Sequence, residues 1–275
     1  MLTVVVRGGG DLASGVALRL HRAGLRVVIT ELPAPLVVRR LVSFAQAVFE
    51  GEWTVEGVTA RRIPEYHAIQ QVFDKGEIPV LVDPECEVLG ELKLIGRKVL
   101  PLVLVDARMT KRPPETDIGA ADLVIGLGPG FIAGENCHVV IETNRGHYMG
   151  RTIWAGLAQP DTGEPEGFGD LYRQRVLRSP AEGVFTPVRQ ICDHVTQGDL
   201  IAEVDGFQLT APFEGILRGL LYPGLNVSLG QKIGDLDPRN DPRLCTLVSD
   251  KSLAIGGGVL EAIFSRRELR NFMWS

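Results

Sequence analysis

The chain has few cysteine, histidine and aromatic residues. Its 275 residues include 4 cysteines and 5 histidines, and aromatic side chains make up 6%. Cys86, Cys137, Cys192 and Cys245 are scattered, and no two of them form a C-x-x-C pair. This spacing excludes a zinc-ribbon or thioredoxin-like motif, so we predict no metal site. We expect most of these cysteines to be buried, and disulfides are not expected in a chain of this size.

Long basic and long apolar runs are also absent. The formal net charge is −5 and no lysine or arginine cluster occurs, which makes nucleic acid a poor candidate partner. No apolar stretch reaches the roughly 18 residues of a membrane span, and the first residues do not resemble a secretory leader. Apolar residues nevertheless make up 45% of the chain, enough for a packed core. We therefore expect a cytoplasmic globular protein without membrane contact.

The first 31 residues have the pattern strand, glycine turn, helix, strand. Val4 to Val6 form a β-branched apolar run that is typical of a buried strand. Gly8, Gly10 and Ala13 then match G-x-G-x-x-G/A, and the second strand ends at Glu31. In a dinucleotide-binding turn the glycines let backbone N–H groups approach a pyrophosphate, and the acid accepts from a ribose hydroxyl.

This motif predicts a set of nucleotide contacts. An alternative is a Rossmann-like layer whose glycines only permit close strand–helix packing around an empty site. Asp11 favours that alternative, because its carboxylate would repel a phosphate unless it caps the helix. The predicted contacts in this motif are Gly8, Gly9, Gly10, Asp11, Ala13 and Glu31.

Further along the chain, apolar runs alternate with helical patterns and several runs end in acids. Such alternation predicts an α/β fold with a Rossmann-like, doubly wound, mostly parallel sheet. Residues 36–49 carry a helical apolar stripe, and residues 85–98 are ambiguous. Ligands of open α/β sheets bind beyond the carboxyl ends of the strands. Candidate groups there are Glu31, Asp83, Asp106 and Glu142, the glycine loop Gly126, Gly128 and Gly130, and the cations Arg108, Lys111 and Arg145.

The second half contains an internal repeat. Residues 180–205 match residues 212–237 at an offset of 32, with a Glu-Gly before a strand in each copy. The pattern is similar to the barrel-sandwich hybrid of biotinyl and lipoyl carriers. The joining segment, residues 204–209, has no lysine, so we expect neither biotin nor lipoate. A structural or docking module is the role that we expect for this half.

These patterns predict four regions. They are a Rossmann-like nucleotide-binding-type domain at 1–156, a linker at 157–176, a small all-β barrel-sandwich hybrid at 177–238, and a C-terminal helical tail at 239–275.

Several long motifs resemble one known family. They are Arg7-Gly-Gly-Gly-Asp-Leu-Ala-Ser-Gly, Val55-Glu-Gly-Val-Thr-Ala-Arg-Arg, Gly128-Pro-Gly-Phe, and the run from His138 through Asn144-Arg-Gly-His-Tyr. Together with Ala254-Ile-Gly-Gly-Gly-Val-Leu-Glu-Ala they resemble the YqeB-type accessory proteins of selenium-dependent molybdenum hydroxylases, which are distantly related to XdhC-type factors. The likeness extends over nearly the whole chain.

The resemblance implies a maturation factor for such a hydroxylase. The first domain would then bind a nucleotide or a molybdenum-pterin dinucleotide, and the barrel and tail would dock the hydroxylase. Any transfer of sulfur or selenium would need a thiolate, for which Cys86 and then Cys137 are weak candidates. Glu85 and Glu87 would raise the pKa of the Cys86 thiol.

Two other functions stay open. One is an NAD(P)-dependent oxidoreductase, in which His147 with Tyr148 would be the candidate acid, although a structural histidine is the simpler interpretation. The other is a non-catalytic scaffold with an empty crevice. A homo-oligomer is compatible with each of these functions.

Overall fold

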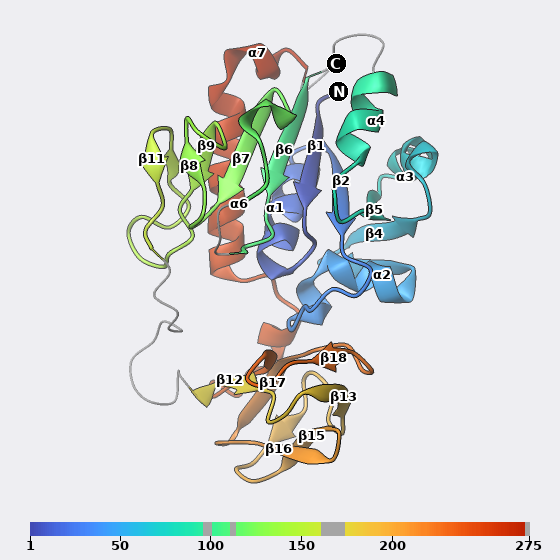
Figure 1. Ribbon diagram of the computed structural model, residues 1–275, viewed down its shortest axis with the longest axis vertical. Coiled ribbons are helices and arrows are strands. Elements are labelled where there is room, and N and C mark those ends of the chain that lie inside the picture. The colour runs from blue at the N-terminus through green and yellow to red at the C-terminus, as the bar shows by residue number, and fades with distance from the viewer. Residues whose placement is uncertain (96–100, 111–113, 161–173, 273–275) are drawn as a thin grey trace. The chain divides into compact units, whose positions relative to one another are not determined.

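The computed structural model describes residues 1–95, 101–110, 114–160 and 174–272 (Figure 1). The chain divides into two compact units, and each draws on separate stretches of sequence. Unit 1 comprises Met1–Pro35, Phe44–Asp161 and Val248–Ser275, and unit 2 comprises Leu36–Ser43 and Thr162–Leu247. Most of the predicted linker, residues 161–173, lies outside the described residues.

Unit 1 is built on one sheet of nine strands. The strands are β1 (Thr3–Arg7), β2 (Arg26–Glu31), β3 (Glu52–Val55), β4 (Val58–Ile63), β5 (Ile78–Val82), β6 (Leu102–Asp106), β7 (Leu123–Leu127), β9 (Val139–Ile141) and β10 (Thr152–Ile153). Their order in the sheet is β10-β9-β7-β6-β1-β2-β5-β4-β3. A second small sheet pairs β8 (Ile132–Ala133) with β11 (Gly156–Leu157).

The nine-stranded sheet is mixed. Its seven inner strands run parallel, whereas the hairpin β3–β4 and the pair β9–β10 are antiparallel and form the two edges. The expected fold class, a Rossmann-like sheet followed by a biotinyl-like barrel, is therefore wrong, whereas the expected C-terminal helix is present as α6 (Asp250–Ser265). A nine-stranded mixed sheet replaces the first part, and the last 28 residues belong to the same unit as this sheet.

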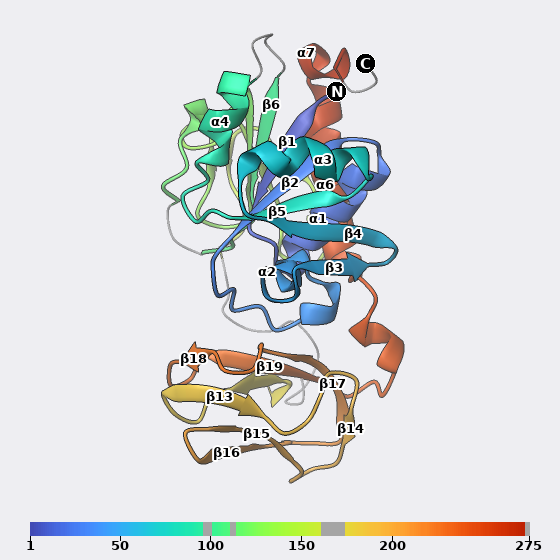
Figure 2. The ribbon, with the colours of Figure 1, turned by 90° about the vertical axis from the view of Figure 1, so that its right-hand side faces the viewer.

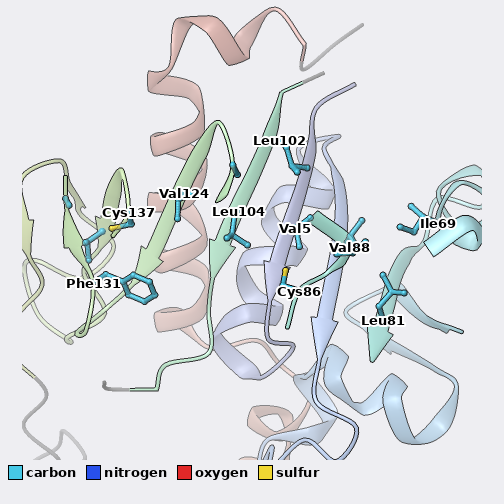
Figure 3. Packing of buried hydrophobic residues seen from close by; sticks show 14 of the residues in the cluster. Val5, Ile69, Leu81, Cys86, Val88, Leu102, Leu104, Val124, Phe131 and Cys137 are labelled. Atoms are coloured by element: carbon cyan, nitrogen blue, oxygen red, sulfur yellow. The ribbon is translucent and has the colours of Figure 1, made fainter. Parts of the chain in front are cut away.

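Helices cover both faces of this sheet (Figure 2). α1 (Asp11–Arg22) and α6 (Asp250–Ser265) lie on one face, and α3 (Ile69–Asp74) and α4 (Val88–Ile95) lie on the other. Alternate residues of the β-branched strands point to opposite faces, as the period of a strand requires. Val5, Val28 and Leu104 thus pack with Ile69 and Val88 in the core beneath α3 and α4 (Figure 3).

The tail helix α6 packs against α1 through glycines and a serine. A Cβ atom on Gly15 would lie 2.4 Å from the Ser252 side chain, and one on Gly256 would lie 2.9 Å from the carbonyl oxygen of Gly15. A Cβ atom on Gly258 would lie 2.1 Å from the carbonyl oxygen of Gly150. The two buried glycines of α6 are therefore explained by close backbone packing within unit 1. The short helix α7 (Arg267–Arg270) follows.

The helix expected over residues 36–49 is wrong. The chain there forms two 3₁₀ turns, η1 (Arg40–Val42) and η2 (Phe44–Gln46), and only the single α-helical turn α2 (Ala47–Glu50). The physical reason is that the segment is divided between the two units: the residues up to Ser43 belong to unit 2, and those from Phe44 belong to unit 1. Its apolar side chains are buried in two different cores, so they do not form one helical face.

Unit 2 consists of two four-stranded antiparallel sheets. Its strands are β12 (Val176–Arg178), β13 (Gly183–Pro187), β14 (His194–Val195), β15 (Leu200–Val204), β16 (Phe207–Thr210), β17 (Gly215–Leu220), β18 (Asn226–Val227) and β19 (Lys232–Asp237). The sheet orders are β12-β19-β17-β14 and β16-β15-β13-β18. These separate sheets replace the barrel-sandwich hybrid that the repeat predicted.

The two copies of the repeat exchange their short strands. β14, from the first copy, pairs with β17, and β18, from the second copy, pairs with β13. Ile201 and its repeat partner Ile233 are both fully buried in one apolar cluster. The short 3₁₀ helix η5 (Pro242–Cys245) ends this unit. Among the helices that the structure describes, none is long and apolar enough to cross a membrane.

Candidate functional site

The carboxyl ends of the parallel strands bring several predicted residues to one edge of the unit 1 sheet. In an open α/β sheet this edge is where ligands bind. The pairing register places Thr30, Arg7 and Asp106 side by side at the ends of β2, β1 and β6. All three side chains are buried, with exposed fractions of 1%, 8% and 1%. We take this edge, together with the loops that follow the strands, as the candidate site.

Glu31 binds the glycine turn of its own chain. Its Oε2 accepts a hydrogen bond of 2.7 Å from the N–H of Gly9, and its Oε1 accepts one of 2.7 Å from the N–H of Leu32. Burial raises the pKa of the Glu31 carboxyl, and these two hydrogen bonds partly oppose the rise. The two oxygens that were expected to meet a ribose thus already accept from backbone donors.

The glycine turn also contacts Phe44 and Ala45. The N–H of Ala45 donates to the carbonyl oxygen of Gly9 at 2.9 Å, and the N–H of Phe44 donates to Ser14 Oγ at 2.8 Å. A Cβ atom on Gly9 would lie 2.9 Å from the Ala45 nitrogen. Gly8 needs glycine for a different reason, since its φ of +100° is in the left-handed region. Packing therefore accounts for Gly9, and backbone conformation accounts for Gly8.

The remaining residues of the motif begin helix α1. Gly10 is the N-cap in an extended conformation, and the buried Ala13 lies in the first turn. Asp11 is the first residue of the helix, and its Oδ1 accepts a hydrogen bond of 3.0 Å from Ser252 Oγ on α6. As nucleotide contacts, the residues from Gly8 to Ala13 stay predictions.

Arg7 occupies the middle of the edge. Its Nη2 donates to the carbonyl oxygen of Pro84 at 2.7 Å and lies 3.9 Å from Glu85 Oε2, a carboxylate whose side chain is 80% exposed. Its Nε is buried and has no hydrogen-bond partner among the described residues. A buried guanidinium with an unused donor is costly, because burial removes its water.

Asp106 is fully engaged by its neighbours. Its oxygens accept from Arg108 Nε at 3.1 Å, from Arg108 Nη2 at 2.8 Å, and from the hydroxyl of Thr116. The Arg108 guanidinium also pairs at 3.1 Å with Glu115, whose side chain is 82% exposed. The edge therefore carries two arginines, and each of them has an exposed glutamate as a counter-ion.

Cys86 lies on the core side of this edge, next to Val5 and Val88 (Figure 3). Its φ is +60°, which is rare for a residue with a side chain. Burial is the main cause that raises the pKa of its thiol to about 11, and the hydroxyl of Thr30 beside it partly opposes the rise. Burial likewise raises the pKa of the Cys137 thiol to about 11. Both thiols are protonated at neutral pH, which disfavours either as a sulfur or selenium carrier.

The second glycine loop is also tightly packed. A Cβ atom on Gly126 would lie 2.1 Å from the ring of Phe131, and one on Gly128 would lie 2.3 Å from Thr143 Oγ1. Gly130 has a φ of +104°. The first two positions need glycine for contacts within unit 1 and the third for its backbone conformation.

The loop after β9 holds the other candidates. Glu142 is buried, and its oxygens accept from the N–H groups of Asn144 at 2.7 Å and Gln159 at 2.8 Å. His147 is exposed, and its carbonyl oxygen accepts from Arg151 Nε at 3.1 Å.

Asp83, which follows β5, caps α4 by accepting from the N–H groups of Glu87 and Val88. Strand-end acids here bind backbone groups of their own chain.

Sequence reasoning missed Arg7 and Thr30 as site residues. The signal was present, because a charged residue directly follows Val4 to Val6 in the central strand β1. Within the described ranges, no three or more His, Cys, Asp or Glu side chains gather in a way that could hold a metal ion. The chemistry available at the edge is thus recognition of negative charge by guanidinium groups.

One curated relative is similar to nearly all of this chain. It is the uncharacterized protein YqeB of Escherichia coli K12, which is 49% identical over 260 residues that make up 94% of this chain. The match extends over 47% of that protein, so the chain spans about half the length of the curated relative that it matches. This similarity supports the resemblance to YqeB-type proteins. No family model matches the chain.

Solved structures with a weaker likeness have other names. An aspartoacylase family protein from Mesorhizobium loti is 14% identical with a TM-score of 0.28, and the match covers 86% of this chain and 84% of that one. A succinylglutamate desuccinylase/aspartoacylase from Rhodobacter sphaeroides is 15% identical with a TM-score of 0.26, covering 87% and 86%. The ectoine utilization protein EutE from Ruegeria pomeroyi, with bound product, is 12% identical with a TM-score of 0.22, covering 86% and 57%.

These comparisons correct the expected function. None of these names supports the expected maturation factor for a selenium-dependent molybdenum hydroxylase: the relative is called uncharacterized, and the matched structures are named as aspartoacylase, desuccinylase and ectoine utilization proteins. At TM-scores below 0.3 the same structures carry no argument for a deacylase activity of this chain. The hydroxylase as partner and the pterin dinucleotide as ligand stay predictions of the resemblance.

Proposed function

We propose that unit 1 binds a small anionic ligand of the nucleotide-phosphate class at the carboxyl edge of its sheet, with Arg7 as the group that receives the negative charge. The observation that carries this proposal is the buried Arg7 guanidinium, whose Nε has no partner among the described residues. An anion would supply the missing acceptor, and hydrogen bonds between a guanidinium and a phosphate are strong and directional.

The exposed counter-ions support the same proposal. Glu85 and Glu115 are mostly in solvent, and Glu85 Oε2 lies 3.9 Å from its arginine. Exposed ion pairs of this kind contribute about 0–1 kcal/mol, so an incoming phosphate would displace either carboxylate at little cost. A ligand with two phosphates could then replace both glutamates.

The position differs from that of a dinucleotide in the glycine turn. There, Gly9 and Glu31 hydrogen-bond to each other, and Ala45 lies against Gly9. A pyrophosphate at the turn would have to separate these groups. A phosphate beside Arg7 would have to displace only exposed side chains.

The test is a thermal-shift and calorimetry series on the full chain with ADP, NAD, NADP and inorganic phosphate. We expect at least one of the nucleotides to raise the midpoint of unfolding, and the binding to weaken with added salt. Arg7→Gln should weaken that binding by about tenfold or more, since it removes a charged hydrogen-bonding partner. A stronger response to NAD or NADP than to ADP would identify a nicotinamide nucleotide as the better ligand.

The matched control is Arg22→Gln. Arg22 is an exposed arginine of the same unit that pairs with Glu56, away from the strand ends. This variant should bind as the unchanged protein does. The proposal fails if none of the four ligands binds, or if Arg7→Gln and Arg22→Gln reduce binding equally.

A further inference from the structure

Two cysteines of unit 2 meet at one backbone carbonyl. Cys192 lies in the connection between β13 and β14, and Cys245 is the last residue of η5. The N–H of Cys192 donates to the carbonyl oxygen of Leu217 at 2.8 Å, and Cys245 Sγ lies 3.7 Å from the same oxygen. Leu217 is fully buried in β17, which pairs with β14 (Figure 2). Residues far apart in sequence are thus held together by one central strand.

The side chains of the two cysteines also interact. Burial is the first cause that raises the pKa of the Cys245 thiol, to about 12, and a hydrogen bond with the Cys192 thiol is the second. Both cysteines are in the reduced form. Two interacting thiols that are held at the same strand carbonyl need little movement to form a bond, because a disulfide requires mainly a short distance and suitable directions.

Their surroundings give the two thiols different roles. Cys192 is half-buried and can meet a small molecule, whereas Cys245 is 1% exposed. Cys192 has a φ of +81°, which is strained for a residue with a side chain. The guanidinium groups of Arg39 and Arg218 lie near Cys245 and favour its thiolate. Arg39 also donates to the carbonyl oxygens of Leu244 and Leu247, which holds it beside η5.

We propose that Cys192 and Cys245 form a reversible intramolecular disulfide, with a small-molecule disulfide such as oxidised glutathione as the oxidant. Cys192 loses its proton and its sulfur attacks one sulfur of glutathione disulfide, which breaks that S–S bond and releases one glutathione thiolate. Cys245 then gives its proton to the departing glutathione sulfur as its own sulfur attacks Cys192 Sγ, which breaks the mixed disulfide and releases the second glutathione as a thiol. The two cysteines give up two electrons, and glutathione disulfide takes them up as it becomes two thiols.

The cross-link would fix the end of unit 2. Cys245 precedes Thr246 and Leu247, where unit 2 ends, so the bond would tie this segment to the β13–β14 connection. A disulfide that forms and breaks is consistent with a reducing compartment, where lasting structural disulfides are rare. Because it lies in unit 2, this pair does not depend on the anion site proposed for unit 1.

The experiment oxidises the full chain with a graded ratio of oxidised to reduced glutathione, blocks free thiols with an alkylating reagent, and maps the peptides by mass spectrometry. We expect one linked species that joins the peptides of Cys192 and Cys245 with the loss of two hydrogen atoms, and its reversal by dithiothreitol. The peptides of Cys86 and Cys137 are internal controls, which should stay unlinked because both residues are buried in unit 1.

Two variants separate the roles. Cys245→Ser should stop at a stable glutathione adduct on Cys192, and Cys192→Ser should give neither adduct nor cross-link. The proposal is overturned if Cys192 and Cys245 both stay free at the most oxidising ratio, if Cys192 keeps glutathione in the unchanged protein, or if the linked peptides come from two chains. Because the main readout uses the unchanged protein, a variant that fails to fold does not affect it.

Discussion

The buried arginine at the sheet edge of unit 1 and the buried carboxylates of unit 2 are paired to different extents. In unit 2 the buried carboxylates of Asp235 and Asp237 meet the guanidinium groups of Arg175, Arg218 and Arg239 at distances from 2.5 to 3.4 Å. Every one of these carboxylates has at least two arginine partners. In unit 1 the buried guanidinium of Arg7 has one carbonyl oxygen, a distant exposed glutamate and an unused donor.

This difference separates a structural ion network from a candidate binding group. A closed network has no capacity left for a ligand, and its value is the fixed arrangement of the strands that carry it. An incompletely paired buried cation is costly in the free protein, and a ligand that pairs with it recovers that cost. Unit 1 also contains a closed pair, in which the buried Asp106 accepts from Arg108, so Arg7 is an exception within its own unit.

The largest effect on stability is expected when one carboxylate of the ion network in unit 2 is removed. Asp235→Ala removes the acceptor of Arg175 Nε and Arg218 Nη2 and leaves three arginines to share the single carboxylate of Asp237. We expect a loss of about 3–5 kcal/mol in the free energy of unfolding of this unit. Urea unfolding followed by hydrogen exchange, which reports on each unit separately, measures it. A loss below about 1 kcal/mol would show that the network is not structural.

A second variant acts on the backbone contact in unit 1. In Gly258→Ala the new methyl group meets the carbonyl oxygen of Gly150 and cannot be relieved by a side-chain movement. We expect a loss of about 1–3 kcal/mol in the stability of unit 1. The neighbouring Gly257→Ala is the matched control, because nothing lies within 4 Å of its Cβ position. It should stabilise the helix by up to about 1 kcal/mol. Equal effects in thermal unfolding would contradict this account of α6.

The network also predicts how acid acts on unit 2. Burial would raise the pKa of Asp237, but hydrogen bonds from Arg239 and the charges of Arg175 and Arg218 outweigh it and leave the pKa at about 2. Because the pKa is lowered in the folded state, the stabilisation is complete above the unfolded value of 3.8 and is lost as the pH falls from about 4 to 2. Asp237→Asn should flatten that part of the pH–stability curve. An unchanged slope would contradict the pairing.

Arg7→Gln should have a much smaller effect on stability than Asp235→Ala. The change removes one hydrogen bond to Pro84 and a weak pair with Glu85, and it also removes the cost of a buried, incompletely paired charge. We expect the stability of the free protein to change by less than about 1 kcal/mol. Chemical unfolding without ligand measures it. A loss of several kcal/mol would make Arg7 a structural residue.

The smallest effect is expected for an exposed pair. Arg243→Ala removes a side chain that is 80% exposed from its pair with Asp241 and keeps the Asp241 cap of η5. We expect almost no change in the free energy of unfolding, measured under the same conditions as Asp235→Ala. A cost similar to that of Asp235→Ala would mean that burial does not decide the worth of these pairs.

Local patterns predicted part of the fold. The β-branched run Val4 to Val6 and the glycine turn after it correctly placed β1, α1 and β2, because each of these signals acts within a few residues. The segment 36–49 could not be predicted in this way. Its conformation depends on Gly9 and Ser14, which bind Phe44 and Ala45, and on its division between two units.

The sequence could predict which edge of the sheet carries the candidate site, but not which groups its side chains contact. The acids Glu31 and Asp106 lie at the carboxyl ends of β2 and β6, and a ligand at this edge stays a prediction. Their partners depend on tertiary contacts, however, and the oxygens of Glu31 and Glu142 accept from backbone N–H groups of neighbouring loops. The contact between Cys192 and Cys245 also depends on tertiary structure, since both residues contact the carbonyl oxygen of Leu217 in β17, which pairs with β14.

The most direct test of the central claim is calorimetric titration of ADP into the full chain and into Arg7→Gln, after unfolding experiments have confirmed that the variant is folded. The account predicts saturable binding to the unchanged protein and binding that is weaker by about tenfold or more in the variant. Equal affinity for ADP in the two proteins would contradict it, because the unused Nε of Arg7 would then play no part in holding the ligand.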